Sequence, residues 1–421
     1  MRVLWFTNTP CGATEKLTGT KVTGGGWLYS LSEALSDIDS IELHIAFYWK
    51  EDIDSFNLDR ITYHPIANKE SSNRINRFIS SFKMLVGINS DKSLIPKLDK
   101  LITEINPDII HVHGSEMNFG LIAEKWSDKV VLSIQGLISP CYNKLFSGYP
   151  KQMVARNNTM TEKLLLRDVN ATERRMCLQA ETEKKIFKNV KYIIGRTEWD
   201  KACSLALNPN RRYFVVNEIL RSDFFSVVWK PRCDTAVFRI VTTVSNGLYK
   251  GVESIYKTAK ILKEAGFVYT WDVIGVSSTD YIVSLTESVE GNSHDLLNIN
   301  LLGRKDAQGM LCALTTADLF VQVSHIENSP NSLCEAMLLG MPIVASFAGG
   351  TCSMLDNGTE GVLLQDGDPY VLAGTVMQVA TNFEKYAGMG AKARMRAIQR
   401  HKPGNVVNEL LNVYNQVIND K

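Results

Sequence analysis

Short apolar runs alternate with amphipathic helical patterns along the first half of this chain. Helical spacing is clearest at 28–38, 95–107 and 173–190. Strands that alternate with helices in this way are typical of parallel α/β layers. The predicted strands fall at residues 2–8, 41–49, 108–114, 129–136 and 191–197.

A second α/β series begins after an irregular, aromatic-rich stretch with prolines at 208–234. Its predicted strands are 237–245, 269–276, 298–303, 317–324 and 342–346. We therefore expect two doubly wound, Rossmann-like domains, covering residues 1–228 and 229–399. A C-terminal helix at about 400–421 is expected to pack back on the first domain. In such folds ligands bind at the carboxyl ends of strands, so the expected site faces a central cleft.

Composition narrows the function classes. The 421 residues are 45% hydrophobic, which is enough for two sizeable cores. The net charge of +1 gives no general field for polyanions, so we expect no nucleic acid partner. The 8 cysteines form no CxxC pair, which indicates reduced thiols. No signal peptide and no apolar run of about 18 residues is apparent, so a cytoplasmic protein is expected.

Two less regular insertions, at 69–93 and 139–160, mix basic and aromatic residues. One interpretation is solvated loops and short helices. The other is a face that binds an acceptor or touches a membrane surface. The second interpretation would place the protein at the inner face of a membrane, in peripheral contact through its N-terminal domain.

The stretch "HIENSPNSLCEAMLLGMP", residues 325–342, follows a buried strand and turns into a helical pattern. Pro330 is favoured in the first turn of a helix, and Asn328 or Ser329 could cap it. The helical spacing starts at about Asn331. The free amides and dipole of such a helix N-terminus suit a phosphate or diphosphate.

Two carboxylates flank this helix start. Glu327 lies in the loop before it, and Glu335 lies about a turn inside it. Carboxylates accept hydrogen bonds from hydroxyls, so the pair would suit the transferred sugar and the ribose of a nucleotide-sugar. On spacing alone, a surface loop residue and a partner of the helix dipole are the simpler interpretation.

A family resemblance favours the nucleotide-sugar interpretation over the simpler one. The Glu327-x7-Glu335 spacing, followed by "AMLLGMPIVAS", "AGG" and "DNGTEGVLLQDGD", closely resembles the C-terminal signature of glycosyltransferase family four. These are retaining enzymes of the two-Rossmann-domain architecture called GT-B. The resemblance implies that Glu327 contacts the donor sugar and Glu335 the ribose. It further implies that the backbone holds phosphate around Ser329, Pro330, Asn331, Ser332 and Leu333.

The segment "TTVSNGLYKGVESIYKTAKIL" resembles the start of the family's donor domain. Lys250, followed by Gly251, matches its lysine–glycine element, and a lysine there could neutralise the diphosphate leaving group. Many family members carry an arginine shortly before this lysine. Here residues 244–247 fill that space without one, so Arg304 is a candidate replacement.

A glycine triplet, Gly24, Gly25 and Gly26, precedes the first helix. It resembles the family's N-terminal glycine loop, which implies that Gly25 and Gly26 let the backbone approach the donor phosphates. Alone, such a triplet is more often a flexible turn. It is not GxGxxG, so a dinucleotide fingerprint is not supported.

Polar residues end three predicted strands of the first half. His111 and His113 share one strand face, but no third ligand accompanies them, so we interpret His111 as a core histidine. His113 resembles the family's cleft histidine, which implies a polar contact or proton handling at the transferred sugar. Gln135 could hydrogen-bond a sugar hydroxyl. Arg196 is a candidate acceptor or phosphate contact, or a surface arginine.

The family resemblance, together with these residues, implies a retaining hexosyltransferase that moves a sugar from a nucleoside-diphosphate sugar to a saccharide or lipid-linked acceptor. Surface polysaccharide biosynthesis is the expected context. No DxD-like element stands out, so no essential metal and no cofactor are expected. Two alternatives remain open: a nucleotide-sugar epimerase of GT-B fold, and a nonenzymatic sugar-binding protein.

Overall fold

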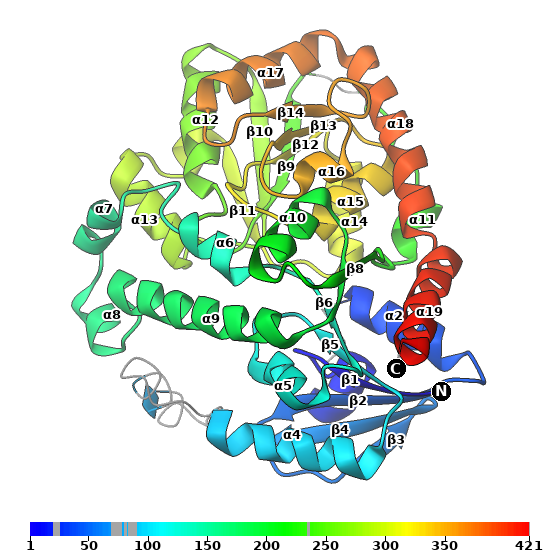
Figure 1. The fold of residues 1–421 in the computed structure, drawn as a ribbon. Coiled ribbons are helices and arrows are strands. Elements are labelled where there is room, and N and C mark those ends of the chain that lie inside the picture. Colours follow the sequence, from blue (N-terminus) through cyan, green and yellow to red (C-terminus); the bar gives the residue numbers. More distant parts are fainter. Residues whose placement is uncertain (20–25, 69–77, 80–81, 83–90, 234–235, 421) are drawn as a thin grey trace. The chain divides into compact units, whose positions relative to one another are not determined.

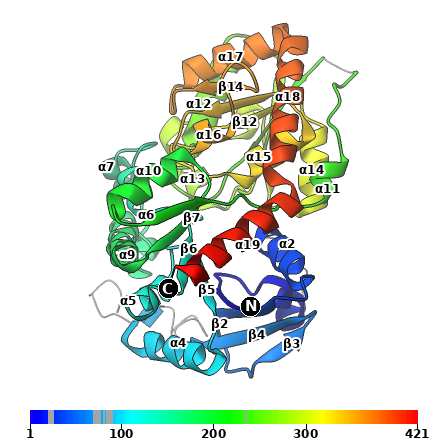
Figure 2. The same ribbon diagram turned by 45° about the vertical axis from the view of Figure 1, so that its right-hand side comes forward.

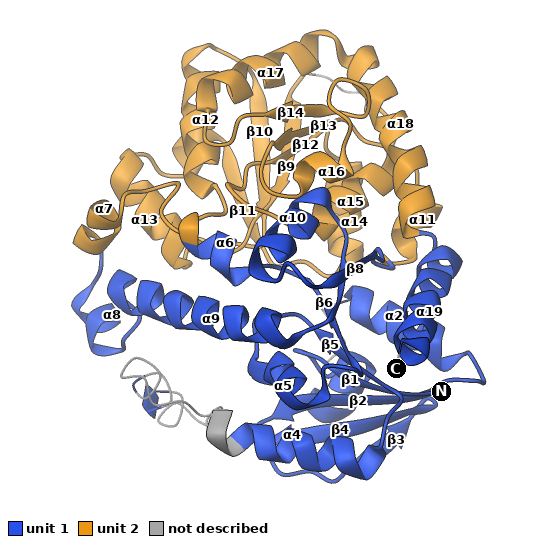
Figure 3. Ribbon diagram, in the orientation of Figure 1, with its two compact units in different colours: residues 1–142, 158–219, 402–421 blue, residues 143–157, 220–401 orange. Residues whose placement is uncertain are grey.

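The computed structural model folds into two compact α/β units, coloured separately in Figure 3. It describes residues 1–19, 26–68, 78–79, 82, 91–233 and 236–420. Most of the insertion at 69–93, and with it the proposed membrane face there, lies outside the described residues. Unit 1 comprises residues 1–142, 158–219 and 402–421, and unit 2 comprises 143–157 and 220–401.

The sheet of unit 1 has, within the described residues, the strand order β3-β4-β2-β1-β5-β6-β7-β8 (Figure 1). All neighbours are parallel except β3 and β4. The strands are β1 (Arg2–Phe6), β2 (Glu42–Trp49), β3 (Phe56–Leu58), β4 (Ile61–Ala67), β5 (Ile109–His113), β6 (Val130–Ser133), β7 (Tyr192–Gly195) and β8 (Arg212–Val215). The helices are α1 (Thr14–Thr18), α2 (Gly26–Ser36), α4 (Asp91–Ile105), α5 (Ala123–Trp126), α6 (Ile138–Asn143), α8 (Met160–Leu164), α9 (Val169–Asn189), α10 (Glu198–Leu207) and α19 (Pro403–Asn419).

Strand β1 explains the layering of unit 1, because it is apolar on both faces. Val3 and Trp5 pack into a core with α2 and α19, whereas Leu4 and Phe6 pack into a second core with α4 and α9. Central parallel strands are covered on both faces and therefore read as continuous apolar runs. Figure 2 shows α19 beside α2, on one face of this sheet.

The C-terminal helix α19 is tied to the sheet of unit 1 by a buried tyrosine. Trp5 Nε1 donates a hydrogen bond of 3.0 Å to the Tyr414 hydroxyl. The same hydroxyl lies 2.6 Å from His111 Nδ1. The second histidine nitrogen, Nε2, lies 2.6 Å from Ser133 Oγ. His111 is therefore a core histidine with both ring nitrogens hydrogen-bonded, which confirms its interpretation from the sequence.

The sheet of unit 2 has the order β11-β10-β9-β12-β13-β14 within the described residues, and all neighbours are parallel. The strands are β9 (Phe238–Thr243), β10 (Tyr269–Ile274), β11 (Ile299–Gly303), β12 (Leu319–Gln322), β13 (Ile343–Ser346) and β14 (Val362–Leu364). The helices are α7 (Lys151–Arg156), α11 (Asp223–Ser226), α12 (Val252–Glu264), α13 (Tyr281–Glu290), α14 (Ala307–Thr315), α15 (Asn331–Leu339), α16 (Thr351–Met354), α17 (Pro369–Thr381) and α18 (Phe383–His401).

The units divide the chain differently from the predicted boundary at 228/229. The structure passes into unit 2 between Ile219 and Leu220. The reason is packing: Leu220, Phe224 and Trp229 are buried in the core that α14, α15 and α18 form on one face of the second sheet. The "irregular" stretch therefore contributes apolar side chains to unit 2 before its first strand begins.

Part of the insertion at 139–160 also belongs to unit 2. Tyr149 is buried, and its hydroxyl donates a hydrogen bond of 3.3 Å to Glu290 Oε1 on α13. Ser288 Oγ donates to Asn157 Oδ1 over 2.7 Å. We call residues 143–157 the strap, because they leave unit 1, pack on helices of unit 2 and return.

Each sheet has one point at which the strand order reverses. In unit 1 it lies between β1 and β5, and in unit 2 between β9 and β12. Loops at the carboxyl ends of such strand pairs form the usual ligand site of doubly wound folds. In the described part of the chain, no helix is both long and apolar enough to cross a membrane.

Two glycines of α18 provide a test of the packing in unit 2. A Cβ on Gly390 would lie 2.4 Å from the Gly340 carbonyl oxygen, whereas a Cβ on Gly388 would meet nothing within 4 Å. We expect Gly390→Ala to lower the free energy of unfolding by about 1–3 kcal/mol, since backbone must move. Gly388→Ala, the matched control, should raise it by about 0.5–1 kcal/mol. Urea unfolding measures both, and equal effects would contradict this packing.

Candidate functional site

The loops after β9 and β12 touch each other through their backbones. Gly251 has φ +79°, and a Cβ there would lie 2.2 Å from the Val323 carbonyl oxygen. Only glycine permits both this conformation and this approach. The amide of His325 donates a hydrogen bond of 2.9 Å to the Tyr249 carbonyl oxygen. Two segments far apart in sequence thus meet at the point where the strand order reverses.

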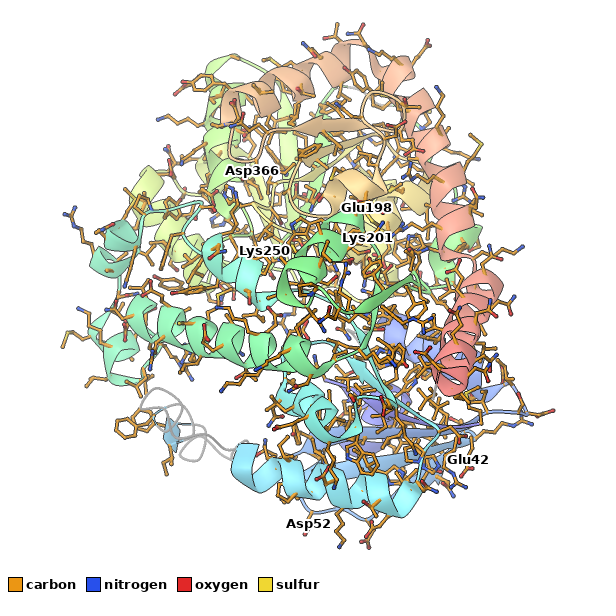
Figure 4. The ribbon with its side chains drawn as sticks, in the orientation of Figure 1. Glu42, Asp52, Glu198, Lys201, Lys250 and Asp366 are labelled. Atoms are coloured by element: carbon orange, nitrogen blue, oxygen red, sulfur yellow. The ribbon has the colours of Figure 1, made fainter. Side chains whose placement is uncertain are left out.

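Lys250 and Glu327, both predicted site residues, are brought together by this contact. Lys250 Nζ lies 2.6 Å from Glu327 Oε1, and the two side chains are 19% and 18% exposed. Ser324 Oγ donates a further hydrogen bond of 2.8 Å to the same oxygen. A Cβ on Gly349 would lie 2.0 Å from the Glu327 carbonyl oxygen, so the backbones of these two residues are in close contact. Figure 4 labels Lys250 among the side chains of unit 2.

Helix α15 begins at Asn331, as the spacing predicted, but its cap differs from the prediction. Pro330 is the N-cap residue, with φ −72° and ψ 112°, and no side chain forms a capping hydrogen bond. The prediction that Asn328 or Ser329 caps the helix is therefore wrong. Ser329 Oγ is buried and lacks a hydrogen-bond partner among the described residues.

Not every residue from 329 to 333, where the backbone is predicted to hold phosphate, has an amide free to donate. Pro330 has no amide hydrogen, so it cannot donate. The Leu333 amide already donates to the Pro330 carbonyl oxygen over 3.0 Å. The first-turn amides of Asn331 and Ser332 have no acceptor within the helix. These two amides and the Ser329 hydroxyl are the donors at this helix start that an anion could use.

Glu335 is buried and paired with an arginine that the sequence interpretation missed. It is 4% exposed. Arg221 Nε donates to its Oε1 over 2.8 Å, and Arg221 Nη2 donates to its Oε2 over 2.7 Å. Burial raises the pKa of the Glu335 carboxyl, and the arginine only partly offsets this. The sequence contains no local signal for the pair, because Arg221 precedes the second sheet altogether.

Arg304, the candidate replacement for the family's arginine, does not join this group. It is exposed in the loop after β11, which is an edge strand of the sheet. Strand β10 separates β11 from β9, whose following loop carries Lys250. A phosphate contact by Arg304 stays a prediction.

In unit 1, His113 lies at the carboxyl end of β5, beside the other reversal point. It is buried, and neither ring nitrogen has a hydrogen-bond partner among the described residues. Its ring lies 4.4 Å from that of Trp5, 5.8 Å from that of Trp27 and 3.9 Å from that of His111. Burial, followed by the charges of His111 and Arg196, holds its pKa well below the usual value. His113 is therefore neutral at pH 7 and can both donate and accept.

Arg196 is not a surface residue. It is 6% exposed, and its Nη1 lies 3.2 Å from Glu218 Oε1, which is fully buried. Its guanidinium lies 4.6 Å from the ring centre of Trp27. Gln135 is half-buried in the loop after β6. Gly26 is the first residue of α2, whereas Gly25 lies outside the described residues.

Two carboxylates near His113 were missed by the sequence interpretation. Glu183 on α9 is fully buried and accepts hydrogen bonds from Ser115 Oγ (2.6 Å) and from the amides of Ile138 and Ser139 (both 2.8 Å). It thereby fixes the loops after β5 and β6. Burial raises the pKa of Glu116, which accepts a hydrogen bond of 3.4 Å from Asn8. Neither residue belongs to a sequence motif, so only the fold brings them to the site.

The described residues contain no cluster of three or more histidine, cysteine, aspartate or glutamate side chains placed to hold a metal ion. That the reaction needs no metal ion stays a prediction.

Comparisons with known proteins agree with the geometry of unit 2. The sequence model of the family "Glycosyl transferases group 1" matches residues 238–396. A curated relative, N-acetyl-alpha-D-glucosaminyl L-malate synthase of Bacillus anthracis, is 27% identical over 129 residues, which is 31% of this chain. The match spans only about a third of that relative's own length, 33%.

Solved structures match the whole chain. Sucrose-phosphate synthase from Thermosynechococcus elongatus superposes with a TM-score of 0.69 at 13% identity, covering 100% of both chains. HepE from Anabaena, solved in complex with UDP-glucose, gives a TM-score of 0.64 at 15% identity and covers 99% of this chain and 100% of its own. Residues 238–396 are thus similar to the family "Glycosyl transferases group 1", which agrees with the resemblance seen in the sequence, and the chain has the GT-B fold.

Proposed function

We propose that the protein is a retaining glycosyltransferase that binds a nucleoside-diphosphate sugar on unit 2. The observation that carries this proposal is the meeting of the Lys250–Gly251 turn with the Glu327 loop at the uncapped start of α15. All three features lie at the reversal point of the sheet, where doubly wound folds bind nucleotides.

The diphosphate would bind the first-turn amides of α15 and the ammonium of Lys250. Helix N-termini favour anions through their unpaired amides and their dipole. Lys250 now pairs with Glu327 over 2.6 Å. A diphosphate carries more negative charge than one carboxylate and would draw the ammonium toward it. Glu327 would then be released to accept a hydrogen bond from a hydroxyl of the transferred sugar.

Glu335 would hold the ribose through the lone pairs that Arg221 leaves open. A carboxylate offers about four acceptor positions, and the two hydrogen bonds from Arg221 occupy two of them. The bidentate arginine also fixes the direction of the carboxylate, which ribose recognition requires. The HepE complex with UDP-glucose supports a nucleotide-sugar donor for this fold.

Transfer would break the bond between the anomeric carbon and the diphosphate oxygen. A new bond would form between that carbon and the acceptor hydroxyl on the same face, and the hydroxyl proton would pass to the departing phosphate. Because Lys250 and α15 supply fixed positive charge to the leaving group, no divalent cation is required. Neutral His113 would make a polar contact or handle a proton at the transferred sugar, and Gln135 and Arg196 would contact the saccharide or lipid-linked acceptor. We place this activity in surface polysaccharide assembly at the cytoplasmic face of the membrane, with the N-terminal half touching the bilayer.

Calorimetry with UDP, GDP and ADP tests the donor site first. We expect one of the three to bind, and Glu335→Ala to weaken that binding. Glu327→Ala should mainly lower turnover, by about a hundredfold, since its contact to the sugar strengthens in the transition state. Glu384→Ala, an exposed glutamate on α18, is the matched control.

The product of a transfer assay, run with nucleotide-sugars of the base that binds, decides the reaction class. The anomeric configuration by NMR should match that of the donor, and EDTA should leave the rate unchanged. If the donor alone is turned over to an epimerised nucleotide-sugar, or if Glu327→Ala and Glu335→Ala leave transfer unchanged, the proposal is wrong.

The Arg221–Glu335 pair makes a separate prediction about stability. Arg221→Ala should lower the free energy of unfolding by about 3 kcal/mol at neutral pH, because it leaves a buried carboxylate unpaired. The deficit should shrink as the pH falls, because Glu335 becomes protonated and the buried charge disappears. Urea unfolding at several pH values measures this, and Arg304→Ala, an exposed arginine, should cost less than about 0.5 kcal/mol. A pH-independent deficit would contradict the burial of the charge.

A further inference from the structure

A second charged cluster lies beside the donor loops of unit 2. His325 Nε2 lies 2.6 Å from Glu253 Oε1, and His325 Nδ1 lies 3.0 Å from Asp366 Oδ2. The side chains of His325 and Glu253 are only 4% and 2% exposed, and that of Asp366 is 24% exposed. Figure 4 labels Asp366 in the same unit as Lys250. The transfer chemistry proposed above uses none of the three.

The three residues come from the segments that build the donor site. Glu253 is in the first turn of α12, directly after the Lys250–Gly251 turn. His325 lies in the loop that carries Glu327. Asp366 follows β14. Because the amide of His325 also donates to the Tyr249 carbonyl oxygen over 2.9 Å, His325 ties the two donor loops together through both its main chain and its ring.

The geometry favours a charged ring. Both nitrogens of His325 face carboxylate oxygens, and only the imidazolium has two N–H donors. Burial by itself lowers the pKa of His325, but the hydrogen bonds and negative charges of Glu253 and Asp366 outweigh it, so the pKa is raised. Lys144 Nζ, on the strap, lies 4.0 Å from Asp366 Oδ2 and balances part of the second negative charge.

The strap closes the cluster on one side. A Cβ on Gly148 would lie 2.7 Å from both the carboxyl carbon and Oε2 of Glu253, so the backbone of the strap presses on this carboxylate. Glu253 Oε2 is buried without a hydrogen-bond partner among the described residues. A buried carboxylate in this position depends on the cation beside it. If His325 loses its proton, the negative charge of Glu253 is therefore no longer compensated by a cation.

We propose that His325 is a positioning residue, which, held between Glu253 and Asp366, fixes the Glu327 loop against the Lys250 turn. The relevance of this position to catalysis rests on the function proposed for that site. Small displacements at such a site are costly, since misplacement by about 1 Å can reduce rates about a hundredfold. His325 itself touches no substrate.

The arrangement has a defined pH dependence. A histidine whose folded pKa is raised stabilises the fold fully below its unfolded pKa and loses that contribution as the pH rises through the folded pKa. On the alkaline side the ring keeps one N–H, so one carboxylate loses its donor. The two donor loops should then loosen together, and the affinity for a nucleoside diphosphate should fall.

Hydrogen–deuterium exchange of His325→Gln tests the positioning directly. We expect exchange to accelerate about tenfold or more in peptides covering 245–255 and 322–332 together, because glutamine carries no positive charge and has both its N–H donors on one nitrogen instead of at the two ring positions. His294→Gln is the matched control: His294 Nδ1 lies 2.7 Å from Glu287 Oε1 in the same unit, but on neither donor loop. Acceleration in one loop only, in neither, or equally in the control would overturn the proposal.

Asp366→Asn removes a negative charge but keeps nearly the same side-chain shape. It provides a second test in case His325→Gln does not fold. Asparagine still accepts a hydrogen bond from His325 Nδ1 but removes a negative charge. The alkaline fall in affinity for UDP, GDP or ADP, whichever binds, should therefore shift to lower pH, while binding at acidic pH stays within about twofold of wild type. An unchanged pH profile would overturn the charge argument. If the wild type binds none of the three, the proposed function fails, and the exchange experiment still decides the positioning claim.

Discussion

The close contact between the Lys250–Gly251 turn and the end of β12 is the constraint on which the proposed donor site depends. The turn can reach the Val323 carbonyl oxygen only because Gly251 has no side chain and adopts φ +79°. This contact aligns Lys250 with Glu327, so the loops that lead into α12 and α15 meet at the reversal point of the sheet. Any larger residue at 251 would separate the two halves of the site.

Buried ion pairs surround both reversal points. Arg221 with Glu335 and His325 with Glu253 lie in unit 2, and Arg196 with Glu218 lies in unit 1. Buried pairs are weak evidence for stability, because desolvation offsets much of the attraction. Their placement is informative for another reason. Each pair fixes the direction of a charged side chain in one of the proposed sites, which fits a role in pre-organising the loops rather than in holding the cores together.

The sequence predicted the layered fold and the start of α15 because apolar periodicity records which faces are buried. The family resemblance brought Lys250 and Glu327 to one site, and the structure joins them over 2.6 Å. The sequence could not reveal the roles of Arg221, Glu183 or the strap. The residues that they contact lie far away in the sequence, so no local pattern indicates these contacts. The expected cap failed for a physical reason: Pro330 itself ends the extended segment, which leaves Ser329 before the cap position.

The central proposal is that a nucleoside diphosphate binds at the start of α15, between Lys250 and Glu327. Backbone amide NMR of the isotope-labelled chain, titrated with UDP, GDP and ADP, tests it most directly. We expect one of these ligands to shift the amides of Gly251, Ser329, Asn331 and Ser332 most strongly. The proposal would be contradicted if no ligand shifted them, or if the largest shifts fell on another part of either sheet.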